Sequence, residues 1–104
     1  MTAQNDHLWL LDARVHVPDD VVYRAFEAET LLLNLDTGQY HGLNPTGARM
    51  LELLEETTGS VHEALARLAE EHEVDKEEIA AEIAEFCAQL AGRGLIEVDE
   101  DPRA

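Results

Sequence analysis

Apolar residues change their spacing once along this chain, at Leu43. Before it, short apolar runs are separated by turn-forming residues, which is typical of strands. Beyond it, apolar residues recur every three or four positions, which is typical of helices that bury one face. The pattern predicts an α+β fold in which a three-stranded antiparallel meander precedes three helices. The predicted strands cover residues 21–27, 30–35 and 39–43.

Each predicted helix begins at a residue that is suited to cap it. Asn44 is followed by Pro45, which tolerates the first helical position because its missing N–H would be unpaired there. Ser60 and Asp75 each have a glutamate three residues later, the spacing of a capping box. The predicted helices end near residues 57, 72 and 92–94.

Outside the predicted sheet and helices, the two ends of the chain differ in character. Residues 1–20 form an N-terminal extension, in which the alternation of residues 13–17 offers one extra strand as an option. Residues 97–104 form an acidic tail that we expect to fray. We expect Leu95 and Ile96, just before this tail, to fold back on the core.

The third predicted helix carries two apolar stripes about 100° apart by the helical period. One has large side chains and the other small ones. The large stripe should fill the core, whereas the small one would either pack inside the domain or allow another backbone to come close. The large stripe is Ile79, Ile83, Phe86 and Leu90, and the small one is Ala80, Ala84, Cys87 and Ala91.

The charge of the chain excludes several classes of partner. Its 104 residues hold 23 Asp and Glu against 7 Lys and Arg, a net charge of -16. Such an excess repels polyanions, so we expect no nucleic acid and no membrane surface as partners, and a winged-helix transcription factor is disfavoured. A cationic peptide would instead be attracted.

The residues that could carry chemistry form no catalytic, metal or cofactor site. The five histidines include no pair at the spacing that puts two ligands on one helical face. Ser60 is explained as a cap, and Cys87 has no basic residue within one helical turn to activate it. A single cysteine and the lack of a signal-peptide pattern favour a cytoplasmic protein. We therefore expect a binding protein that is not an enzyme.

Gly42, in the last predicted strand, points to the kind of binding. A glycine inside a strand marks either a bulge or a close approach by another backbone. Residues 39–43 could thus be an edge strand that is kept open for an incoming peptide. Both interpretations of Gly42 fit the sequence.

The chain resembles the PqqD-like family, the precursor-recognition elements of ribosomal peptide natural-product (RiPP) pathways. The similarity covers about residues 21–96. Its most specific part resembles the stand-alone members of lasso-peptide biosynthesis. This most specific part is Leu35-Asp-Thr-Gly-Gln-Tyr40 with Leu43-Asn-Pro-Thr-Gly-Ala48. Arg93-Gly-Leu-Ile96, after the third predicted helix, also fits the family pattern.

This resemblance implies a winged-helix-like domain that binds the leader segment of a precursor peptide as an added strand, beside the third helix. A stand-alone member would deliver the leader to a separate leader peptidase, after which a cyclase acts; the alternative is a PqqD-type peptide chaperone for a radical enzyme. The segment before residue 21 would either cover the sheet or contact the peptidase. The implied peptide-binding residues are Gln39, Tyr40, His41, Gly42, Leu43, Ile79, Ala80, Ile83, Ala84 and Cys87, the helix contacts being our choice between its two stripes.

Overall fold

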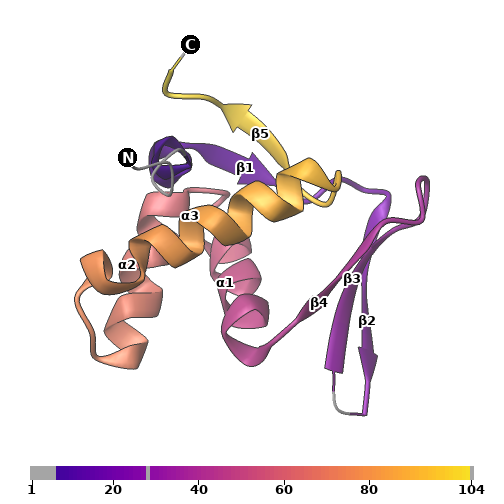
Figure 1. Cartoon of the computed structure of the whole chain (residues 1–104), viewed down its shortest axis with the longest axis horizontal. Helices are drawn as coiled ribbons and strands as arrows, with labels where there is room; N and C mark the ends of the chain where they lie inside the picture. Colours follow the sequence, from indigo (N-terminus) through magenta and orange to yellow (C-terminus); the bar gives the residue numbers. More distant parts are fainter. Residues whose placement is uncertain (1–6, 28, 104) are drawn as a thin grey trace, which may run out of the picture.

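The computed structural model describes residues 7–27 and 29–103, and it places three helices beside a small antiparallel sheet (Figure 1). This arrangement confirms the predicted α+β fold, with the meander first and the helices after it. The elements in chain order are a 3-10 helix η2 (Leu8–Asp12), β1 (Arg14–His16), β2 (Val21–Phe26), β3 (Glu29–Asn34), β4 (Tyr40–Leu43), α1 (Pro45–Glu56), α2 (Val61–His72), α3 (Lys76–Gly92) and β5 (Glu97–Glu100).

The meander has the strand order β2-β3-β4, with β3 in the centre. Its pairing runs from Val21 opposite Asn34 to Phe26 opposite Glu29, and from Thr30 opposite Leu43 to Leu33 opposite Tyr40. Because side chains alternate between the two faces, Leu32 and Leu43 lie on the face that packs against the helices, and both are buried. Each outer strand therefore has one edge that no other strand of the meander covers.

The C-terminal segment differs from its prediction. Residues 97–100 do not fray but form β5, which pairs antiparallel with β1 in a second, two-stranded sheet. Arg103 then lies over the ring of Trp9, with its guanidinium carbon 3.5 Å from the ring centroid. The tail is ordered because the optional strand in the N-terminal extension exists and gives it a partner more than 80 residues away in the sequence, which no local pattern reveals.

The N-terminal extension contributes to the core of the helical layer. Leu10, Ala13 and Val15 are buried there, and η2 lies against α3 and α2. The backbone of β1 is joined to the α1–α2 junction, where the Val15 amide donates to the Gly59 carbonyl at 2.9 Å. The first part of the extension thus packs against the helices.

The predicted caps hold for two of the three helices. The side chains of Asn44 and Ser60 accept hydrogen bonds from the third residue beyond them, at 2.7 and 3.2 Å. Asp75 makes no such side-chain bond; its backbone carbonyl accepts from the Glu78 amide instead. Its carboxylate is exposed beside two first-turn glutamates, whose charges already complement the helix N-terminus.

The end of α3 folds back as predicted. Arg93 caps the helix, Gly94 takes a positive φ of 70°, and the Leu95 amide donates to the Leu90 carbonyl at 2.9 Å. Leu95 and Ile96 are both buried. Within residues 7–27 and 29–103, the helices are all too short or too polar to cross a membrane.

Candidate functional site

The outer edge of β4 presents two residues whose main-chain groups point away from the sheet. In an antiparallel ladder, hydrogen-bonded and non-hydrogen-bonded pairs alternate. The Asn34 amide donates to the Gln39 carbonyl at 2.8 Å, so the alternation places His41 and Leu43 in the bonded pairs with β3. The N–H and C=O groups of Tyr40 and Gly42 therefore face outward.

One of these outward groups already has a hydrogen-bond partner in the structure. Arg93, at the C-terminal end of α3, donates from Nη1 to the Tyr40 carbonyl at 2.9 Å, which supports the assignment of the edge. Beside it, the ring of Phe86 meets the ring of His41 edge to face, with centroids 6.0 Å apart. We refer to Tyr40, His41, Gly42, Phe86 and Arg93 together as the β4–α3 site.

Asn34 holds the two walls of this site together. Its side-chain amide Nδ2 donates to the Gly94 carbonyl at 2.9 Å, while its Oδ1 accepts from the amides of Asp36 and Thr37 in the β3–β4 turn. Asn34 is buried, so these bonds are shielded from water. A single side chain thus fixes the start of β4 against the end of α3.

Gly42 is not a bulge. Residues 30–33 pair with residues 40–43 without a shift of register, and Gly42 is not among the glycines with a positive φ. A Cβ built on Gly42 would meet only Leu31 Cδ2, at 3.9 Å, which is an ordinary contact. Of the two interpretations of this glycine, the structure thus rules out the bulge and leaves the close approach of another backbone.

Comparison with known proteins identifies the family. Residues 29–96, more than half of the chain, match the family described as coenzyme PQQ synthesis protein D (PqqD). The chain belongs to the PqqD family. A solved structure, TbiB1 in complex with the TbiA(beta) leader peptide, is similar to this PqqD family member with a TM-score of 0.67 and 33% sequence identity, over 79% of this chain and 94% of that one. A search of curated proteins finds no match.

The predicted peptide contacts of this PqqD family member fall into two groups. Gln39, Tyr40 and Gly42 are exposed and His41 is partly exposed, so a peptide could reach them. Leu43 is buried in the core, and of the helix residues only Ile79 and Ala80 keep part of their surface. The buried helix contacts, each at most 3% exposed, are Ile83, Ala84 and Cys87.

The prediction of side-chain contacts at Ile83, Ala84 and Cys87 is therefore corrected. The small stripe was expected either to pack internally or to face a peptide, and Ala84 and Cys87 pack internally because η2 and α2 both lie against α3. The helical period of α3 does not reveal that η2 occupies this space.

Two residues of the β4–α3 site were absent from the prediction. Phe86 had been assigned to the core and Arg93 had no role, yet both contact β4. They are seven residues apart, so they lie nearly on one line along the helix. Ile79 lies on the same line, about 10 Å further toward the helix N-terminus by the helical rise. This spacing was the signal that could have identified the face of α3 turned toward β4.

The electrostatics of the β4–α3 site favour neutral His41. Burial lowers the pKa of its imidazole, and the positive charge of Arg93 lowers it further, so the neutral form of the ring predominates at pH 7. Its buried Nδ1 has no hydrogen-bond partner among the residues that the structure describes. The interior of the site therefore combines a neutral ring with Phe86, and its only formal charge is that of Arg93.

We predict that Cys87 does not react with thiol reagents in the folded protein. Burial raises the pKa of its thiol to about 12, so the nucleophilic thiolate is nearly absent at pH 8, and the sulfur is inaccessible. Labelling with a colorimetric disulfide reagent at pH 8 should proceed only through unfolding, and at once in denaturant. Rapid labelling of the native protein would contradict this burial.

Proposed function

We propose that this protein binds the leader segment of a ribosomal precursor peptide as a strand added to β4, without catalysis. The observation that carries the proposal is the open edge of β4, where Tyr40 and Gly42 turn their main-chain groups outward beside α3. The likeness to TbiB1, solved with a leader peptide at 33% identity to this chain, supports the same ligand class.

The edge can supply affinity and register through the backbone. An antiparallel leader strand would exchange hydrogen bonds with both Tyr40 and Gly42, each bond contributing roughly 1 kcal/mol net. These bonds do not depend on the leader's side chains. They would therefore fix where the leader lies rather than which leader is chosen.

Selectivity would come from the side chains on either side of the added strand. Alternate leader residues would point toward α3, where Phe86 and His41 offer an apolar, uncharged surface. The intervening residues would lie beside Tyr40, whose side chain is 59% exposed on the other face of the sheet. Gln39, Ile79 and Ala80 extend this surface at its ends and stay among the proposed contacts.

We further propose that the bound leader is delivered to a separate leader peptidase and cyclase in a lasso-peptide pathway. The sequence Leu35–Tyr40 with Leu43–Ala48 supports this pathway, because it resembles the stand-alone members found there. The second candidate is a peptide chaperone for a radical enzyme, as in PQQ synthesis, which the description of the matched family favours. Both functions would use the same β4–α3 site.

Titration with labelled leader peptides tests the proposal. Leaders of lasso-type and PQQ-type precursors, each with a scrambled control, are followed by fluorescence anisotropy at physiological salt. We expect saturable binding of a lasso-type leader alone. Binding of only the PQQ-type leader would select the chaperone function, and equal binding of leaders and scrambled controls would refute specific recognition.

We predict that Arg93→Met tightens leader binding. Arg93 holds the Tyr40 carbonyl in the free protein, so an incoming strand must displace it before that carbonyl can accept from the leader. Removing an exposed charged contact of this kind should improve affinity up to about five-fold. The control is Arg67→Met on α2, which changes net charge equally away from β4. Weaker binding of Arg93→Met than of the control would contradict displacement.

A further inference from the structure

The three-stranded sheet has a second open edge, on β2. Leu31 and Leu33 are in the non-hydrogen-bonded pairs with β4, so their main-chain groups point toward β2. There they form the hydrogen-bonded pairs with Arg24 and Val22, respectively. The main-chain groups of Tyr23 therefore face outward. In agreement, the Tyr23 carbonyl accepts a hydrogen bond from the side chain of the next residue, Arg24 Nη1, at 3.3 Å.

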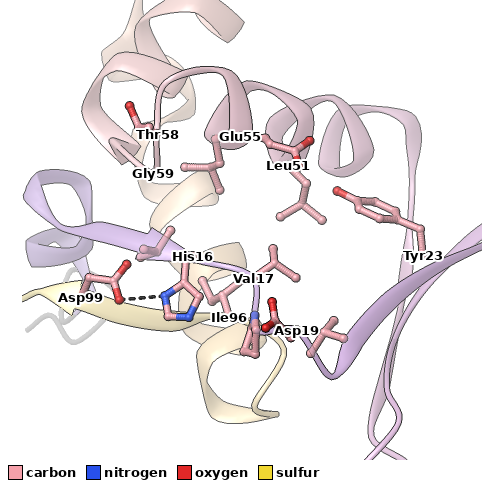
Figure 2. Close-up of a pocket in the computed structure, with 14 residues that line it drawn as sticks. His16, Val17, Asp19, Tyr23, Leu51, Glu55, Thr58, Gly59, Ile96 and Asp99 are labelled. Atoms are coloured by element: carbon pink, nitrogen blue, oxygen red, sulfur yellow. Dashed lines mark hydrogen bonds and ion pairs between the residues drawn. The ribbon is translucent and has the colours of Figure 1, made fainter.

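A cavity of about 540 Å³ lies beside this edge (Figure 2). It is formed by β2, the C-terminal half of α1, the segment after β1 and the β1–β5 pair. Figure 2 shows Tyr23 on one side of the cavity, with Leu51 and Glu55 of α1 above it and Val17 and Asp19 below. Its apolar lining consists of Val15, Val17, Pro18, Val21, Leu51, Leu54 and Ile96. We name it the β2 pocket.

The β2 pocket has an acidic rim with unbalanced charge. Its lining includes three carboxylates and no lysine or arginine. Asp99 pairs with His16 Nδ1 at 2.7 Å, but Asp19 and Glu55 form no ion pair within the part of the chain that the structure describes. Burial and then the negative charges of Glu55 and Glu52 raise the pKa of Tyr23 to about 12, as expected in a negative potential.

We propose that the β2 edge and the β2 pocket together bind an extended segment of the enzyme that receives the leader, in which apolar side chains alternate with lysine or arginine. The open backbone of Tyr23 would pair with the segment, the pocket would hold an apolar side chain, and the free carboxylates of Asp19 and Glu55 would meet its cations.

This inference rests on the proposed function, because a carrier that delivers a bound leader needs a second surface for the recipient. β2 and β4 lie on opposite sides of β3, so the two edges can be occupied at once. The β2 edge can therefore bind a segment of the recipient while the leader occupies β4.

The test is a titration of the ¹⁵N-labelled protein, saturated with its leader, with the synthetic peptide acetyl-Lys-Val-Arg-Val-Lys-amide, followed by NMR. We expect saturable amide shifts at Tyr23, Val17 and Leu54, and none of that size with the matching glutamate peptide acetyl-Glu-Val-Glu-Val-Glu-amide. Equal shifts with both peptides, or no shifts at these residues, would overturn the proposal.

A matched pair of variants separates local recognition from net charge. Glu55→Lys should weaken the cationic peptide about three-fold or more. Glu70→Lys, at a residue that is also exposed but lies near the C-terminal end of α2, should change affinity little. Equal effects of the two variants would contradict a specific site. The leader affinity, measured by fluorescence anisotropy, should be the same in both variants. The experiment therefore distinguishes loss of leader binding at β4 from loss of peptide binding at the β2 pocket.

Discussion

Gly42→Pro should reduce leader affinity about 10- to 100-fold while the fold is retained. The Gly42 amide faces outward, so proline removes no hydrogen bond of the β3–β4 ladder. The preceding residue, His41, is already in a strand and accepts the extended backbone that a following proline requires. The variant loses the residue 42 N–H group that would donate to the leader. The leader carbonyl that accepts this bond would be buried against the proline ring without a partner.

Gly42→Ala is the matched control for this variant. It keeps the amide, and its Cβ makes only an ordinary contact with Leu31, so affinity should change less than about three-fold. Anisotropy gives both affinities, and circular dichroism gives the helix content. An unchanged affinity in Gly42→Pro, with its helices intact, would refute strand addition at β4.

The largest effect on stability is expected from Gly59→Ala. Gly59 has a φ of 89°, and a Cβ there would overlap the carbonyl oxygen of Val15. The strained backbone and the displaced β1 should together lower the free energy of unfolding by about 3 kcal/mol or more. Chemical denaturation followed by circular dichroism measures this loss.

Gly92→Ala makes the same chemical change without either cause of strain. Gly92 ends α3 with nothing within 4 Å of its Cβ position and no positive φ, so alanine should leave stability equal or raise it by up to about 1 kcal/mol. Equal stability of the two variants would show that β1 is not held against the α1–α2 junction.

Local patterns predicted most of the fold because each element carries its own signal. Strand and helix bounds match within about two residues, and Asn44 and Ser60 cap as their sequence context indicates. The β1–β5 pair was missed because its strands are short and far apart in sequence. Asp75 shows that a capping box in the sequence does not ensure a side-chain bond.

The candidate site was predictable on the strand and less so on the helix. An edge strand with Gly42 can be found from alternation and a turn, since strand pairing there is local. The face of α3 that meets β4 depends on how Asn34 and Gly94 dock the two elements, 60 residues apart. The periodicity of α3 gives two stripes but does not say which neighbour each one meets.

Hydrogen exchange of individual amides tests strand addition most directly. The amides of Tyr40 and Gly42 should exchange much more slowly when leader peptide is saturating, because each would then donate to the leader. The His41 amide, which already faces β3, and the Tyr23 amide on the β2 edge should change little. Unchanged exchange at Tyr40 and Gly42 with the leader bound would contradict the account.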